Sequence, residues 1–167
     1  MSADFKQRLT FDLAKGELRD GDIRYVILRE DSLMGLFKRL PEPVRMEALK
    51  AFAASAAEYG GRSAARYTAE DGDARYLLAT IAANAPQLGW GVWHFSLSKA
   101  GELQLEVKNS PFAHGYGAAP EAVCAPITGM LSAVASIVFD APAQAEEIHC
   151  ACAGGSVCRF RARRREP

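Results

Sequence analysis

The sequence lacks an excess of charge of either sign, because 20 basic residues balance 20 acidic ones in a chain of 167 residues. A neutral chain gives no general electrostatic reason to bind nucleic acid or an acidic membrane. The opening stretch MSADFKQRLTFDLAKGELRDGD carries charges throughout and lacks an apolar run, which excludes a signal peptide there. With 49% hydrophobic and 24% charged residues, the composition predicts one globular domain over residues 1–167.

Long hydrophobic runs are scarce, and the most apolar one covers residues 122–139. This run reaches the minimum length of a membrane span but contains Pro126 and Gly129 together with hydroxyl residues. We therefore predict a helix buried on nearly all sides, and no membrane span.

Catalytic and phosphate-binding motifs are also missing. His94 and His114 have no serine or cysteine partner at a motif spacing, and the stretches GGRSA and CAGGS lack the lysine of a phosphate-binding loop. The C-terminal stretch RFRARRRE is interpreted as a solvated strand face, not as a nucleic-acid site. These absences favour a protein that is not an enzyme.

The periodicity of apolar residues changes along the chain from helical to alternating. The first part predicts a strand over 23–30 after a hairpin, a helix capped near Asp31, and a helix over 43–59 that breaks at Gly60–Gly61. A further helix over DARYLLATIAANA should stop before Pro86.

Alternation then predicts a hairpin with strands in WGVWHFSLS and over 103–108, and a turn near 99–101. The stretch NSPFAHGYGAAPEA is expected to be a loop, followed by a helix over 121–139 and two strands near 143–150 and 156–163. The fold class predicted is α+β, with helices packed on an antiparallel sheet.

Three of the four cysteines lie in nine positions near the C-terminus, where Cys150 and Cys158 flank a Gly-Gly turn. Cys124, on the predicted apolar helix, is placed to approach them, and thiolates are good ligands for soft metal ions. Spacing alone leaves a metal site and incidental core cysteines equally open, since no C-x-x-C pair is present. The nearby side chains that offer a fourth ligand are Glu147, His149 and Cys152.

The pattern from Cys124 through Glu147-x-x-Cys150 to Gly-Gly-x-x-Cys158 resembles the signature of the 4-vinyl reductase domain family. In particular, it resembles the N-terminal aromatic-sensing domains of phenol- and xylene-responsive transcription activators. The resemblance implies a structural zinc ion held by Cys124, Glu147, Cys150 and Cys158. Cys152 is additional to the pattern, and an all-cysteine site or an iron–sulfur centre is the alternative.

The resemblance extends over most of the chain, including the opening segment, EYGGRSAARY, APQLGWG and VKNSPFA. It implies the ligand-binding fold shared by nitric-oxide-signalling and Golgi-transport proteins, with an interior pocket for a small hydrophobic or aromatic molecule. Trp93 and Phe95 are assigned to the core. The pocket residues expected are Phe37, Trp90, Val107, Phe112 and Tyr116.

Two departures from the phenol sensors concern ligand recognition. The positions of their ligand-binding histidine and tryptophan fall near Gly89 and Val107, and neither side chain can hydrogen-bond a hydroxyl group. We therefore expect a larger or more apolar ligand than phenol.

The function expected is that of a cytoplasmic, homodimeric sensor or carrier that acts through a separate regulator protein. The alternative is an accessory protein of bacteriochlorophyll synthesis that binds 4-vinyl tetrapyrrole precursors.

Overall fold

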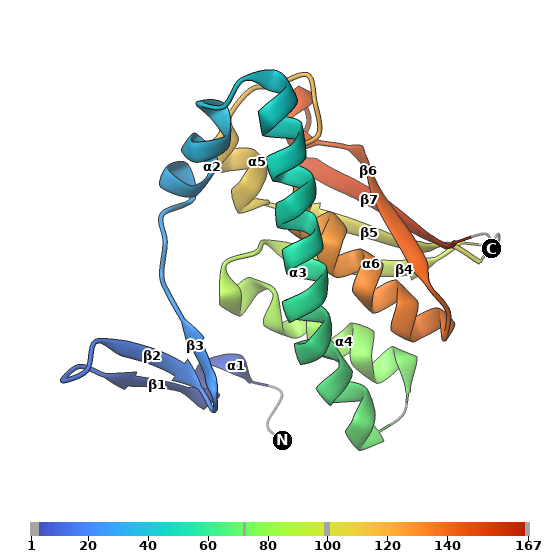
Figure 1. The fold of residues 1–167 in the computed structure, drawn as a ribbon. Coiled ribbons are helices and arrows are strands. Elements are labelled where there is room, and N and C mark those ends of the chain that lie inside the picture. The colour runs from blue at the N-terminus through green and yellow to red at the C-terminus, as the bar shows by residue number, and fades with distance from the viewer. Residues whose placement is uncertain (1–3, 72, 99–100, 166–167) are drawn as a thin grey trace.

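The computed structural model describes residues 4–71, 73–98 and 101–165 of the chain (Figure 1). In this part the helices are α1 Phe5–Arg8, α2 Glu30–Lys38, α3 Glu42–Asp71, α4 Ala74–Asn84, α5 Pro111–Tyr116 and α6 Ala125–Phe139. Two short 3₁₀ helices are η1 Pro86–Leu88 and η2 Ala151–Ala153. The strands are β1 Leu9–Asp12, β2 Glu17–Asp20, β3 Ile23–Tyr25, β4 Val92–Leu97, β5 Leu103–Lys108, β6 Ala143–His149 and β7 Val157–Arg164.

The larger sheet is antiparallel, with the strand order β4-β5-β7-β6. Leu105 lies opposite Phe160 in the register, and both side chains are almost completely buried. Their neighbours Glu106 and Arg159 point to the other face, where they form an exposed ion pair. The alternation in the sequence thus predicted both hairpins correctly; Lys99 and Ala100 of the predicted turn lie outside the described residues.

Helices cover the buried face of this sheet in two layers (Figure 1). Helix α6 contacts β6 and β7, and the long helix α3 packs across α6. The two helices approach very closely at Gly129, where an added Cβ atom would lie 1.9 Å from the carbonyl oxygen of Ala53. This arrangement confirms the predicted α+β class and the buried apolar helix, which begins at Ala125 and not at 121. Among the described residues, no helix combines the length and the hydropathy needed to cross a bilayer.

The predicted break at Gly60–Gly61 is wrong, because α3 continues through both glycines. An added Cβ atom at Gly60 would lie 2.9 Å from Met130 Cε, and one at Gly61 would lie 2.9 Å from Ala133 Cβ. These glycines therefore serve close packing between helices, a tertiary contact that compensates for their low helix propensity.

A second antiparallel sheet, with the order β1-β2-β3, lies near the N-terminus. The strand predicted over 23–30 is shorter than expected, since β3 ends at Tyr25 and α2 begins at Glu30. Between them, Val26 and Ile27 are 82% and 80% exposed. The loop predicted around residue 114 is also wrong in part, because Ser110 caps the short helix α5 by accepting a hydrogen bond from the Ala113 amide.

Candidate metal centre and ligand cavity

Four side chains with metal-binding atoms converge where α6 begins and the last two strands meet. Cys124 is the N-cap residue of α6, Glu147 lies on β6, Cys150 follows β6, and Cys158 lies on β7. Their ligand atoms all lie within 4.8 Å of one another. The three cysteines are buried, and all are free thiols. The cluster predicted from the sequence pattern is thus brought together, and it could hold a metal ion.

An irregularity in β6 allows Glu147 and Cys150 to face the same point. Residues an odd number of positions apart in a regular strand point to opposite faces. Here the pairing of β6 with β7 shifts its register between Glu147 and His149. This bulge supplies the bend that simultaneous convergence of the two side chains requires.

The contacts of Glu147 make a carboxylate at this position unusual without a cation. Its Oε2 accepts a hydrogen bond of 2.9 Å from the Cys124 amide, whereas the buried Oε1 has no partner among the described residues. Burial, followed by repulsion from the Cys150 sulfur, raises the pKa of Glu147 to about 8. A cation bound between these atoms would satisfy Oε1 and offset both effects.

The Cys124 sulfur lies within hydrogen-bonding distance of two other sulfur atoms of the cluster. The Sγ of Cys124 lies 3.9 Å from that of Cys150 and 3.7 Å from that of Cys158. Hydrogen bonds to these two neighbours, with burial, raise the pKa of Cys124, while the bonds from Cys124 and Cys158 lower the pKa of Cys150. The Ala151 amide also donates to the Cys158 sulfur over 3.3 Å. Such donors stabilise thiolate charge, the form in which cysteine binds metals.

Cys152 lies outside this cluster. Its buried Sγ donates a hydrogen bond of 3.3 Å to the carbonyl oxygen of Ala113. The converging set therefore contains three thiols and one carboxylate, and neither Cys152 nor His149 belongs to it.

A cavity of about 560 Å³ lies between the N-terminal sheet and the helices α3 and α4. Its walls combine aromatic and aliphatic side chains with a few polar ones. Lining residues include Phe5, Ile23, Tyr25, Phe52, Ala56, Ala64, Ile81, Leu88, Trp90, Trp93 and Met130 among the apolar side chains, and Arg8, Asp20, Ser63, Arg66, Tyr67 and Asn84 among the polar ones.

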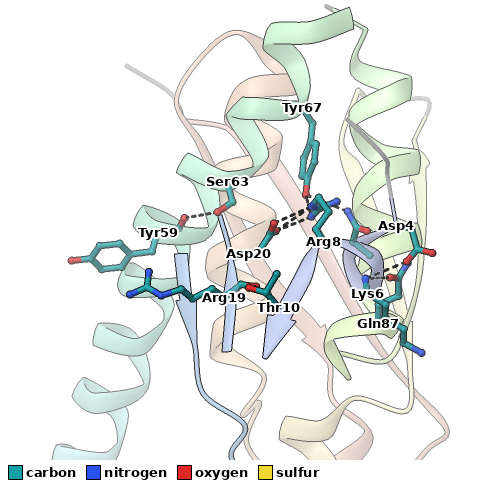
Figure 2. A network of polar contacts seen from close by, with 11 residues as sticks. Asp4, Lys6, Arg8, Thr10, Arg19, Asp20, Tyr59, Ser63, Tyr67 and Gln87 are labelled. Atoms are coloured by element: carbon teal, nitrogen blue, oxygen red, sulfur yellow. Dashed lines mark hydrogen bonds and ion pairs between the residues drawn. The ribbon is translucent and has the colours of Figure 1, made fainter. Parts of the chain in front are cut away.

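A connected polar cluster, formed by Arg8, Asp20, Tyr67 and Asn84, contributes to this wall. Figure 2 shows Arg8 between Asp20 and Tyr67. Arg8 donates from Nε and Nη2 to the Asp20 carboxylate at 3.0 to 3.2 Å, and from Nη2 to the Tyr67 hydroxyl at 3.1 Å. Asn84 Nδ2 donates to the same hydroxyl at 3.3 Å. The buried Asn84 Oδ1 has no partner among the described residues.

The sequence reasoning missed this polar cluster because its residues come from distant elements and follow no motif. One signal was available on α4, where Leu77, Ile81 and Asn84 recur at helical spacing and are all buried. A polar residue that ends an apolar stripe is a candidate for a binding role.

Of the five expected pocket residues, Trp90 lines the cavity. Phe112 packs edge-on against Trp90 with ring centroids 5.1 Å apart, and Phe37 stacks on Phe52 at 5.5 Å. Val107 and Tyr116 are buried elsewhere in the core, Tyr116 beside the Lys38 ammonium. Apart from Trp90, the expected residues are not among those that line this cavity.

Trp93, which the sequence analysis assigned to the core, both belongs to the core and lines the cavity. Its indole N–H donates to the Trp90 carbonyl oxygen over 2.9 Å, which fixes the segment that leads into β4.

Comparison with known proteins places the four-ligand cluster in a recognised domain. Residues 103–164 match the 4-vinyl reductase (V-4-R) domain. This V-4-R segment includes β5 to β7, α6 and all four converging ligands. The resemblance to the 4-vinyl reductase family is thereby confirmed. No curated protein matches the chain in sequence.

Solved structures extend the likeness beyond the V-4-R segment. The phenol-responsive sensory domain of the transcription activator PoxR, solved with phenol, is 19% identical, with a TM-score of 0.77 over 94% of this chain and 85% of that one. Trafficking protein particle complex subunit 3 from Naegleria fowleri, covalently bound to palmitic acid, is 14% identical, with a TM-score of 0.55 over 82% and 95%. An H-NOX protein from S. oneidensis in the Fe(II)NO state is 15% identical, with a TM-score of 0.53 over 87% and 82%. The expected fold is thus confirmed.

Proposed function

We propose that this protein is a sensor or carrier that binds a small hydrophobic or aromatic molecule in the cavity beneath its N-terminal sheet. The observation that carries the proposal is a space of about 560 Å³ whose wall is mostly aromatic and aliphatic. Cavities of this kind, with a few polar groups, are typical of small-molecule sites. The V-4-R segment and the fold shared with a phenol-responsive sensory domain support the same class of function.

The proposed ligand is larger than one aromatic ring. Sites of about 300–1,000 Å³ bury drug-sized molecules, so a single phenol ring would leave most of this cavity unfilled. Gly89 and Val107 offer no side-chain hydrogen bond at the two positions where the phenol sensors bind a hydroxyl group. A molecule with two or more fused rings, or a long aliphatic part, suits the space better.

The metal proposed for the four-ligand cluster is a structural zinc ion. Four ligands at Zn–S distances of about 2.3 Å in a tetrahedron place sulfur atoms roughly 3.8 Å apart. The Cys124 sulfur lies 3.9 and 3.7 Å from the other two, which fits this geometry. Cys124, Glu147, Cys150 and Cys158 would fill all four positions, so zinc would contribute folding energy and no open site for catalysis.

Zinc at this position would link three elements, of which α6 contributes to the cavity wall. Cys124 fixes the start of α6, and the other ligands fix β6 and β7. Helix α6 in turn carries Met130, which lines the cavity. The metal would therefore hold part of the wall in place without contact with the ligand.

We further propose that residues 1–167 act as one cytoplasmic ligand-binding domain that forms a homodimer and signals through a separate regulator protein. The four free thiols agree with a compartment that keeps cysteines reduced. The exposed apolar side chains of Val26, Ile27 and Leu36 agree with burial against another chain.

Native mass spectrometry of the purified protein tests these points together. The expected spectrum shows a dimer, one zinc ion per chain and a retained apolar molecule. Calorimetric titration with phenol should show no micromolar binding. A colourless protein with no metal and no uptake of any aromatic compound would refute both the zinc and the ligand assignments.

A further inference from the structure

We infer that the ligand of this cavity carries a neutral hydroxyl group, which Tyr67 and Asn84 recognise together. This inference rests on the proposed function, because it specifies the chemistry of the molecule bound at the same site. It depends on two atoms whose hydrogen-bonding capacity is not used by the described residues: the hydroxyl hydrogen of Tyr67 and the Oδ1 of Asn84.

The Tyr67 hydroxyl acts as an acceptor toward the protein. It accepts one hydrogen bond from Arg8 Nη2 and one from Asn84 Nδ2. A phenolic hydroxyl also carries one donor hydrogen. No hydrogen bond donated by this group is present in the described part of the chain, so the donor is available to a molecule in the cavity that Tyr67 lines.

The Asn84 side chain supplies the complementary acceptor. Asn84 is only 6% exposed, and its Nδ2 is held by Tyr67, while its Oδ1 has no partner among the described residues. A buried carbonyl without a partner is destabilising. Since Asn84 lines the cavity, a ligand inside it can remove this cost by donating a hydrogen bond.

The Tyr67 donor and the Asn84 acceptor lie in adjacent side chains, and a hydroxyl group is complementary to such a pair. A hydroxyl accepts from Tyr67 and donates to Asn84, whereas an ether or ketone can only accept. An aromatic hydrocarbon offers neither partner and leaves Oδ1 unsatisfied.

The charges near the polar cluster disfavour an acid. Arg8 is already bound in a bidentate manner to Asp20, so the pair is close to neutral. A ligand carboxylate would meet the Asn84 oxygen and lose its hydration without an unpaired cation to replace it. Arg66 also lines the cavity but is exposed, where solvent weakens its attraction.

Calorimetric titration at pH 7 with 2-naphthol, naphthalene and 2-naphthoate tests this inference. These probes share one ring system and differ in the polar group. We expect the wild-type protein to bind 2-naphthol roughly tenfold more tightly than naphthalene, from two net hydrogen bonds, and to bind 2-naphthoate most weakly.

Three variants assign the preference to named atoms. Asn84→Leu removes the acceptor at similar volume, and Tyr67→Phe removes the donor; each should bring the ratio of 2-naphthol to naphthalene affinity close to one. Ser63→Ala is the matched control, because Ser63 lines the same cavity but its hydroxyl donates to the Tyr59 carbonyl oxygen. This control should keep the wild-type ratio, and thermal unfolding checks that every variant folds.

The outcomes separate this inference from the proposed function. Equal affinity for 2-naphthol and naphthalene in the wild-type protein would overturn the hydroxyl assignment and leave an aromatic-binding cavity. A preference that persists in both Asn84→Leu and Tyr67→Phe would also overturn it. Binding of none of the three probes would overturn the proposed function together with this inference.

Discussion

Replacing Glu147 by glutamine should have opposite effects on stability with and without metal. Glutamine has the shape of a protonated glutamic acid, and its carbonyl oxygen can still accept the hydrogen bond from the Cys124 amide. In the metal-free protein, the pKa of Glu147 is raised from 4.5 to about 8, mainly by burial. The folded state therefore holds this group protonated at neutral pH, whereas the unfolded chain ionises it.

The magnitude follows from linkage. A folded-state pKa above the unfolded value stabilises the protein fully below the unfolded pKa, and this stability is lost as pH rises toward the folded pKa. Between pH 4.5 and about 8 the metal-free protein should thus become less stable. At pH 7 the loss amounts to about 3 kcal/mol relative to acidic pH. Glu147→Gln removes this loss, so it should stabilise the metal-free protein by up to about 3 kcal/mol at pH 7 and by almost nothing at pH 4.

With zinc bound, the sign should reverse, because a neutral amide is a much poorer ligand than a carboxylate. The assay is urea unfolding at pH 4 and pH 7 of protein treated with a chelator, and at pH 7 of zinc-loaded protein. Glu146→Gln is the matched control. Glu146 points to the opposite face of β6 from Glu147, where its exposed carboxylate pairs with Arg161 of β7, so this change removes one charge away from the cluster. A destabilised metal-free Glu147→Gln protein at pH 7, or one stabilised by zinc as strongly as the wild type, would refute the reasoning.

Further predictions concern the cluster and the helix crossing. Cys158→Ser should lose zinc in native mass spectra, whereas Cys152→Ser should keep one ion per chain, because the Cys152 thiol is hydrogen-bonded to the Ala113 carbonyl oxygen outside the cluster. Equal zinc content in the two variants would contradict the ligand set. Gly129→Ala should destabilise the protein by about 3 kcal/mol or more in urea unfolding, since overpacking against rigid backbone is costly and the new Cβ atom would lie 1.9 Å from a carbonyl oxygen of α3. Gly60→Ala meets only the end of the flexible Met130 side chain and should cost much less, and equal losses would disprove the assigned contact.

The sequence was most informative where the signal is local. Strict alternation identified β5 and β7, since their inner residues, such as Leu105 and Phe160, are buried against helices. For the cluster, spacing alone left the interpretation open, and the resemblance to the 4-vinyl reductase signature implied the four residues whose ligand atoms lie within 4.8 Å of one another. A strand with one buried face requires alternating apolar residues, so the local sequence carries that signal directly.

Prediction failed where contacts between distant segments override local preference. Gly60 and Gly61 have low helix propensity, yet α3 continues through them because α6 packs directly on that surface. The polar cluster of the cavity joins Arg8 to Tyr67 across 59 positions, and no local pattern encodes this pairing. Ser110 at the start of α5 was a readable helix cap, so this helix was predictable.

The polar cluster also has an energetic consequence for the architecture. Arg8 and Asp20 belong to the N-terminal segment, while Tyr67 lies on α3 and Asn84 on α4, so residues from two parts of the chain line the same cavity. A molecule that binds more tightly when the two parts are together would stabilise their association. By reciprocity, an interaction that holds the N-terminal strands against the helices would increase the affinity for that molecule. Ligand binding and the position of the N-terminal strands would thereby be thermodynamically coupled.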